Sequence, residues 1–211
     1  MHISEGVLSA PVLLGCGVAA AAGVGVGLAK MREEDVVKTA VLSSALFVAT
    51  LIRVPLGPSS VHLILNGLAG LLLGWQVFPA FAVALLLQAA LFGFGGISTL
   101  GVNVLILGGP GIVCFYLFNR LALTAAPGKV FWVGLASGAC AIFVGGMLLA
   151  GVLITTGEEF TIVAGAVLVA HLPVLVVEGL VTGTAVSFLR KVRPETLAKH
   201  PGITQSLGEN R

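Results

Sequence analysis

Long stretches without a charged residue dominate this chain. The first runs from Leu8 to Ala29 and contains no Asp, Glu, Lys or Arg. About 20 mainly apolar residues in a helix are enough to cross the hydrocarbon layer of a membrane. Only 9% of the 211 residues are charged, whereas an ordinary soluble domain carries about 25%. The charges are therefore too few to cover a water-soluble globule, which argues against a soluble enzyme.

Glycine supports the same conclusion. The chain has 29 glycines, and most lie inside apolar runs rather than in polar linkers. Small residues allow transmembrane helices to approach one another closely. The net charge is only +2, and the cations form no stripe, so we expect no nucleic-acid partner. The composition predicts an all-α, polytopic protein within the lipid bilayer.

Seven apolar segments are predicted to be transmembrane helices. They cover residues 8–29, 37–52, 60–75, 77–94, 103–123, 130–154 and 160–189. The third segment is short, and six spans would result if it were re-entrant. In the fifth segment, the Gly and Pro residues at 108–111 predict a break or kink. We expect a single transmembrane metal-binding domain over residues 1–191 and a polar cytoplasmic tail over 192–211.

The distribution of Lys and Arg predicts the orientation. With seven spans, ten of the eleven Lys and Arg residues fall on one side, and Arg53 falls on the other. Cytoplasmic loops carry an excess of these residues. The N-terminus is therefore predicted to be external and the C-terminus cytoplasmic, as expected for a multi-pass protein of the inner (plasma) membrane.

The first two residues could chelate a metal ion. The start of the chain lacks the cationic region of a signal peptide, and the bulky His2 disfavours removal of Met1, so we expect a free amine. The Met1 amine and the His2 amide nitrogen would close a five-membered chelate ring. The His2 amide and its own Nδ1 would close a six-membered ring. Three nitrogens in one plane suit Ni²⁺ or Cu²⁺.

A fourth in-plane donor is needed, and His62 is the candidate. It lies near the start of the third predicted segment, on the same external side as Met1. By itself His62 could also be a helix-end histidine that faces lipid headgroups. Together with His2 and an unblocked amine, it indicates a metal site.

Several motifs resemble one known family. Residues 1–6 (MHISEG) are similar to the MHIxEG opening of the CbiM/NikM family, and residues 59–63 (SSVHL) to its His-containing segment. Residues 87–103 (LQAALFGFGGISTLGVN) resemble its LLQAxLFGxGGxxTLGxN signature. The short segments His171-Leu172-Pro173 and Glu178-Gly179 also resemble segments of that family. This family comprises the substrate-capturing membrane subunits of energy-coupling-factor (ECF) transporters for cobalt and nickel.

The resemblance implies a ligand set and a set of partners. The ligands would be the Met1 amine, the His2 amide and ring, and the His62 ring, with Ni²⁺ or Co²⁺ as the transported substrate. The partners would be two ATP-binding subunits, a coupling membrane subunit and often a small additional membrane protein. No GxxxxGK[ST] motif occurs in the 211 residues, so we predict a transporter subunit without its own ATPase. Many relatives carry His at the position of Phe94, which leaves cobalt and nickel both open.

Other polar residues could have more than one role. Glu5, Thr99 and Asn103 are candidates to support the metal ligands from outside the coordination sphere, but Asn103 could instead cap the fifth helix. His171 and Glu178 could relay protons or could fix the helix bundle by hydrogen bonding. A stand-alone, proton-linked secondary carrier for divalent transition metals, with both of these residues essential, is the alternative function.

Overall fold

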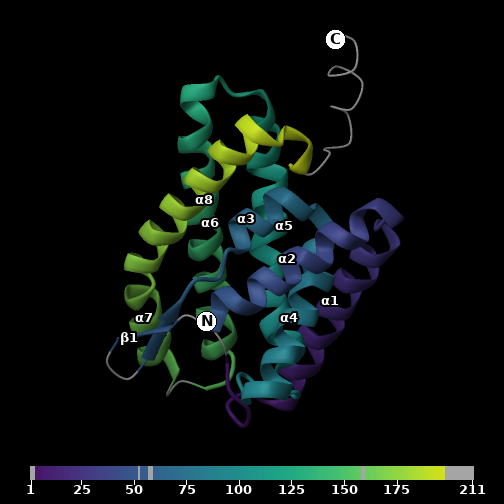
Figure 1. Cartoon of the computed structure of the whole chain (residues 1–211). Helices are drawn as coiled ribbons and strands as arrows, with labels where there is room; N and C mark the ends of the chain where they lie inside the picture. The colour runs from purple at the N-terminus through teal and green to yellow at the C-terminus, as the bar shows by residue number, and fades with distance from the viewer. Residues whose placement is uncertain (1–2, 52, 57–58, 158–159, 198–211) are drawn as a thin grey trace.

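The computed structural model describes residues 3–51, 53–56, 59–157 and 160–197. Helices pack into a bundle, and a two-stranded antiparallel hairpin lies at one side of it (Figure 1). The elements are α1 (Ala10–Ala29), α2 (Glu33–Leu51), β1 (Arg53–Leu56), β2 (Ser59–His62), α3 (Asn66–Leu73), η1 (Gly74–Gln76), α4 (Val77–Phe92), α5 (Leu100–Thr124), α6 (Pro127–Ile154), α7 (Thr161–Ala170), α8 (Leu172–Val192) and η3 (Pro194–Thr196).

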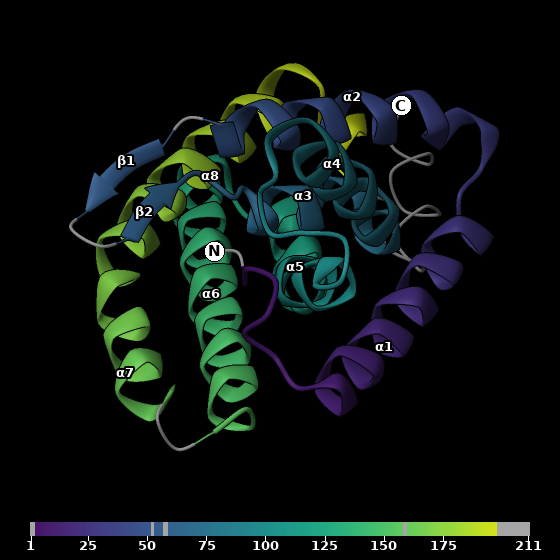
Figure 2. The ribbon, with the colours of Figure 1, turned by 90° about the horizontal axis from the view of Figure 1, so that it is seen from below.

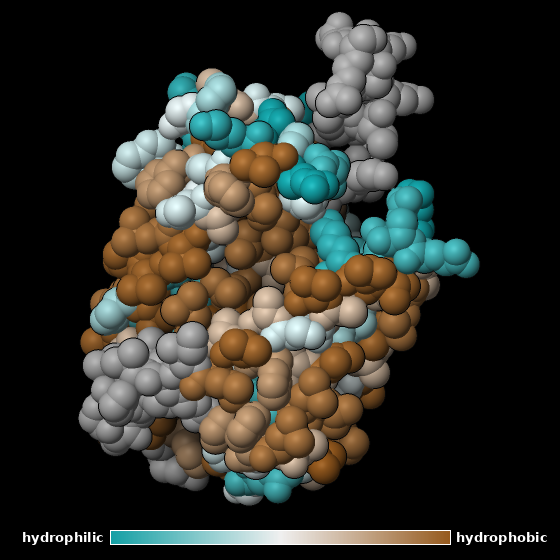
Figure 3. Space-filling model, in the orientation of Figure 1, coloured by the Kyte–Doolittle hydropathy of each residue, from teal (hydrophilic) through white to brown (hydrophobic). Residues whose placement is uncertain are grey.

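The described chain contains five helical segments long and apolar enough to cross a membrane. They are Ala10–Ala29, Asn66–Phe92, Leu100–Thr124, Pro127–Ile154 and Thr161–Val192. The face shown in Figure 3 is largely hydrophobic between hydrophilic residues at its top and its lower edge. These findings confirm a predominantly helical membrane protein. The orientation of the termini and the total of seven spans stay predictions.

Two of the expected spans differ from the structure. The predicted third segment, residues 60–75, begins as strand β2 and continues as the eight-residue helix α3, which is too short to cross a membrane by itself. The second expected segment is helix α2, but α2 is not among the five apolar segments. Its first turn holds Glu33, Glu34 and Asp35, which lowers its apolar character.

Helix α3 lies in the interior of the bundle. Viewed from below, α3, α4 and α5 lie between α1 on one side and α7 on the other (Figure 2). All α3 residues except Leu68 are buried. A Cβ at Gly70 would collide with the Gly111 carbonyl of α5, so the two backbones are in direct contact. Helix α5 continues through Pro110, so the predicted break is wrong, whereas the alternative of a kink stays a prediction. Gly111 serves helix packing.

The last predicted span is divided into two helices. Residue His171 both ends α7 and precedes α8, and Pro173 lies in the first turn of α8. Proline lacks an N–H and clashes with the carbonyl four residues earlier, which disfavours a continuous helix. His171 Nδ1 lies 2.7 Å from the Val167 carbonyl oxygen on its own helix. The expected span over residues 160–189 is thus found as one apolar helical segment, Thr161–Val192, with an interruption at His171.

Candidate metal site

The first described residue, Ile3, is held by a side chain from α5. Its N–H donates to Asn103 Oδ1 at 2.9 Å, and its carbonyl accepts from Asn103 Nδ2 at 3.1 Å. Both groups are buried, with Ile3 4% and Asn103 2% exposed. One amide side chain thus satisfies both main-chain polar groups of Ile3, much as a neighbouring strand would. This pair fixes the main chain directly after His2.

Glu5 makes a second connection to the loop that precedes α5. Its Oε1 accepts hydrogen bonds from the Ser98 N–H at 3.1 Å and from Ser98 Oγ at 3.2 Å. The bond from the Ser98 backbone N–H lowers the pKa of the Glu5 carboxyl most, and the bond from the Ser98 hydroxyl lowers it further. The loop passes close to Glu5 at Gly96, whose φ of +116° is one that residues with side chains rarely adopt. The acidic residue near the terminus therefore has a specific partner.

Thr99 completes this arrangement. Its Oγ1 donates to the Gly96 carbonyl at 3.4 Å and accepts from Asn103 Nδ2, also at 3.4 Å. Thr99 is the residue before α5, yet its side chain makes no capping bond, and the Asn103 side chain binds Ile3 instead of capping the helix. We call Ile3, Glu5, Ser98, Thr99 and Asn103 the N-terminal clamp.

The clamp joins three of the residues singled out from the sequence. Glu5, Thr99 and Asn103 gather at the N-terminal segment, and Ser98 is the member that sequence reasoning missed. A serine in a loop has no distinctive pattern, so only the position of its neighbours reveals it. Met1 and His2 lie outside the described residues, so their predicted role as ligands stays a prediction.

His62 is the last residue of β2. In the hairpin it is the register partner of Arg53, and it is buried, with 4% of its surface exposed. Its Nδ1 lies 3.2 Å from the Leu63 carbonyl oxygen. In the tautomer protonated on Nδ1, that nitrogen donates to the carbonyl and Nε2 offers its lone pair to a metal ion. The role of the His62 ring as a nitrogen ligand stays a prediction.

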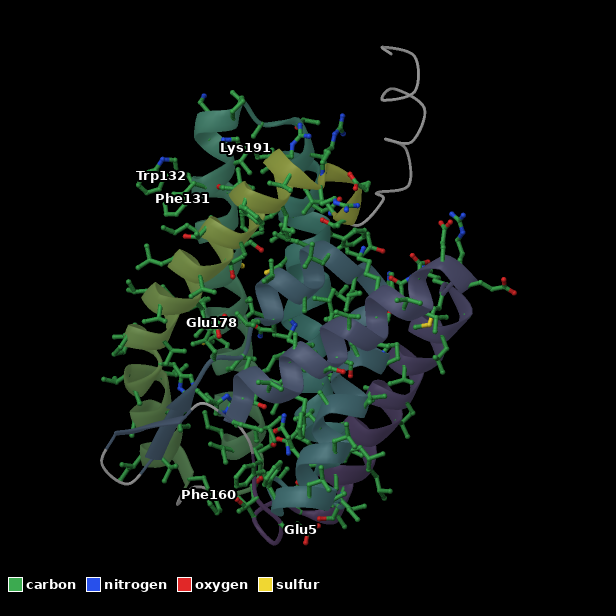
Figure 4. All side chains as sticks on the ribbon, viewed as in Figure 1. Glu5, Phe131, Trp132, Phe160, Glu178 and Lys191 are labelled. Carbon is green, nitrogen blue, oxygen red and sulfur yellow. The ribbon has the colours of Figure 1, made fainter. Side chains whose placement is uncertain are left out.

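The segment after His62 is anchored by Glu178 of α8. The carboxylate accepts hydrogen bonds from the N–H groups of Ile64 and Leu65. Glu178 is fully buried and lies midway between Glu5 at one end of the molecule and Lys191 at the other (Figure 4). Of the two roles considered for Glu178, this geometry matches hydrogen bonding between separate elements. His171 and Glu178 form no hydrogen bond with each other.

Within the described residues, no group of three or more His, Cys, Asp or Glu side chains could hold a metal ion. His62 is the one member of the predicted ligand set that the structure describes. The full set therefore depends on the nitrogens of Met1 and His2. What the described residues provide are hydrogen bonds with nearby backbone groups, between Asn103 and Ile3 and from Ile64 and Leu65 to Glu178.

The family comparison gives the decisive observation on identity. A family model described as "CbiM: Cobalt uptake substrate-specific transmembrane region" matches residues 2–196. The chain belongs to the CbiM family. As a CbiM-family member it is a transmembrane protein of metal transport, and the resemblance seen in the sequence motifs is confirmed.

Two relatives and one solved structure show how far the similarity of this CbiM-family chain extends. A putative metal transport protein of Haemophilus influenzae is 42% identical to this chain. The alignment covers 93% of this chain and 97% of the length of that relative. A fused nickel transport protein NikMN of Rhodobacter capsulatus is 32% identical to this chain. The alignment covers 94% of this chain but only 64% of the length of that relative. The crystal structure of a truncated transition metal transporter has a TM-score of 0.68 and 23% identity, and it covers 94% of this chain and 100% of that one. At that identity the structural likeness establishes the fold alone.

Proposed function

We propose that this protein captures Ni²⁺ or Co²⁺ at the external face of the plasma membrane and passes it inward as the substrate-binding subunit of an ATP-driven ECF-type uptake transporter. Its N-terminus is external and its C-terminus cytoplasmic in this proposal. The family description names cobalt, and a relative that matches 94% of this chain is named for nickel. The observation that carries the proposal is the Asn103 clamp on Ile3, beside the predicted chelate.

The clamp matters because of the atoms it occupies. The proposed ligands are the Met1 amine, the His2 amide nitrogen, the His2 ring and the His62 ring. The Ile3 N–H, which is the next amide along the chain, is engaged by Asn103 Oδ1. It therefore stays protonated, and the chelate is confined to the first two residues. Amide coordination releases a proton, so affinity for the metal should rise with pH.

Glu5, Thr99 and Asn103 support the ligands rather than bind the metal. Asn103 binds Ile3 directly, Thr99 accepts a bond from Asn103, and Glu5 accepts a bond from Ser98 in the loop before α5. Such supporting residues typically change metal affinity about 10–100-fold when they are mutated. The proposal includes both Co²⁺ and Ni²⁺ as transported ions, because these residues are compatible with either one.

Transport would require partners that supply the energy. We propose two ATP-binding subunits, a coupling membrane subunit and a small additional membrane subunit. The fused nickel relative, of which this chain spans 64%, supports the presence of a further membrane component. In vesicles, sustained metal uptake should need ATP and these partners. Sustained uptake by this subunit alone, driven by a proton gradient, would instead favour the secondary carrier.

The metal site can be tested with one added residue. The native protein and a variant with one residue inserted before Met1 would be purified, and the bound metal would be measured by elemental analysis. Intact-mass measurement would establish that Met1 is retained with a free amine. The insertion converts this amine to an amide but changes neither the helices nor His2 and His62. We expect stoichiometric Ni²⁺ or Co²⁺ in the native protein and its loss in the variant. Unchanged binding would refute the terminal chelate.

A further inference from the structure

Glu178 is a buried carboxylate that the proposed ligand set does not use. It lies in the helical segment Thr161–Val192 and is fully buried. A charged group inside a membrane domain is costly and usually has a specific role. In the described chain, the ion pairs Arg32–Glu34 and Arg193–Glu195 do not involve Glu178. Its hydrogen-bond partners there are the backbone N–H groups of Ile64 and Leu65.

These two N–H groups form a small anion-binding turn. Consecutive backbone N–H groups that converge on one anion make such a concavity. Leu65 has a φ of 57° and is the one non-glycine residue in the described chain with a positive φ. That conformation is unfavourable for a residue with a side chain. The Leu65 N–H lies 3.0 Å from both carboxylate oxygens, so Glu178 holds the turn in its unusual shape.

His62 lies directly before this turn. On one side its main chain belongs to the hairpin, where it is paired with Arg53. On the other side only Leu63 separates it from Ile64, whose N–H the carboxylate binds. The backbone of His62 is therefore held between the hairpin on one side and the turn on the other.

Helix packing on α6 allows Glu178 to reach the turn. A Cβ at Gly138 of α6 would lie 2.5 Å from the Glu178 carbonyl oxygen, and a Cβ at Gly67 of α3 would lie 2.8 Å from the Ser137 carbonyl oxygen. Helices α8 and α3 thus both contact the α6 backbone at adjacent residues. This close approach brings a side chain of α8 to the N-terminal end of α3.

We propose that Glu178 is a positioning residue for His62, which it orients toward the metal ion through the turn at Ile64 and Leu65. The proposal rests on the proposed function, because it takes His62 as the fourth nitrogen ligand. In Glu178→Gln a neutral amide with one acceptor oxygen replaces the carboxylate, and its NH₂ group faces an N–H donor where the second oxygen stood. The two N–H groups are then held more weakly, so the turn relaxes and the His62 ring leaves the coordination plane. The three nitrogens of Met1 and His2 then hold the ion with a water oxygen in the fourth place.

The test compares Ni²⁺ binding by the full-length protein and its variants in detergent. Affinity would be measured by titration calorimetry and the ligand set by the visible d–d absorption of planar Ni²⁺. The variants are Glu178→Gln, His62→Ala, their combination, and Thr182→Val as the matched control. Thr182 is also fully buried on α8, one turn from Glu178, and its hydroxyl has no hydrogen-bond partner in the described chain.

We expect Glu178→Gln to weaken Ni²⁺ binding about 10–100-fold, the range typical of residues that orient metal ligands. Its absorption band should move to longer wavelength, as in His62→Ala, because an oxygen donor replaces a nitrogen. The double variant should bind no more weakly than His62→Ala alone, since both changes remove the same ligand. Thr182→Val should match the native protein in both measurements.

Two results would overturn the proposal. One is a Glu178→Gln protein with native affinity and the native spectrum. The other is weaker binding that keeps the four-nitrogen spectrum and adds to the loss from His62→Ala, which would indicate a purely structural role. If Glu178→Gln does not fold, Glu178→Asp shortens the carboxylate by one methylene and should give the same spectral shift with a smaller loss. Failure of the native protein to bind Ni²⁺ would instead refute the proposed function.

Discussion

Two segments that carry proposed metal donors are anchored by single side chains from distant helices. Asn103 of α5 holds the N-terminal segment at Ile3, and Glu178 of α8 holds the His62 segment at Ile64 and Leu65. Asn103 donates one bond and accepts another, because Ile3 presents one N–H and one carbonyl. Glu178 only accepts, because the turn presents two N–H groups. In each case the side chain has the hydrogen-bonding capacity that the backbone requires.

The comparison separates two kinds of support within one proposed site. Buried bonds such as those of Asn103 leave costly unpaired groups when they are broken. The bond between Glu5 and Ser98 is exposed, and water can replace it. We therefore expect the buried anchors to determine donor geometry and the exposed bond to have a smaller influence.

The largest effect is expected at Asn103. Asn103→Leu keeps the approximate side-chain volume but leaves the N–H and carbonyl of Ile3 unpaired. Each unsatisfied buried group costs about 1–3 kcal/mol, and Ni²⁺ affinity should fall about 10–100-fold. Thermal unfolding and calorimetric titration would measure the two effects.

Asn103→Asp sharpens the comparison between the two anchors. It keeps an acceptor for the Ile3 N–H but loses the donor to the Ile3 carbonyl. An intermediate loss would show that both bonds contribute. A full loss of affinity in Asn103→Asp, with native binding in Asn103→Leu, would contradict the anchor described here.

A smaller effect is expected where α8 contacts α6. Gly138→Ala places a methyl group 2.5 Å from the Glu178 carbonyl oxygen, so the helices must separate. Such overpacking typically costs about 1–3 kcal/mol, and it should also weaken the Glu178 bonds. Gly151→Ala is the matched control on the same helix, because nothing lies within 4 Å of a Cβ there. Equal unfolding temperatures for the two variants would refute the close contact.

The smallest effect is expected at Glu5. Its pKa is lowered in the folded protein by hydrogen bonds from Ser98. The carboxylate therefore adds stability above its unfolded pKa, and this contribution disappears as the pH falls through the lowered folded value. Unfolding measured from pH 7 to about pH 3 should show this loss in the native protein, but a weaker pH dependence in Glu5→Gln. Identical profiles would show that the Ser98 bonds do not stabilise the fold.

Much of the helical framework could be predicted from apolar runs. The expected segments 77–94, 103–123 and 130–154 correspond to α4, α5 and α6, with ends that differ by a few residues. The clearest error concerns residues 60–75, where hydropathy by itself could not distinguish a strand and a short buried helix from a span. The break at His171 had a local signal in Pro173, but hydrophobicity continued across it.

The candidate site was predictable where chemistry depends on residue type and order. The chelate of Met1 and His2 follows from bonds along the chain, and it stays a prediction because these residues lie outside the described part. Glu5, Thr99 and Asn103 were found as candidates, but their partners were not. The turn at Ile64 and Leu65 acts through backbone groups, which have no signature in a sequence. Ser98 acts through its backbone N–H as well as its hydroxyl, and a lone loop serine has no distinctive pattern.

The sequence by itself determined that this is a helical membrane protein of the CbiM family, because too few charges cover it and its motifs are specific to that family. Only the tertiary structure decided which distant segments meet. Asn103 lies 100 positions from Ile3, and Glu178 lies 114 positions from Ile64. Glu178 reaches Ile64 because glycines allow close helix contacts in the interior. In both pairings each buried N–H and carbonyl must find a partner, and that requirement depends on three-dimensional packing.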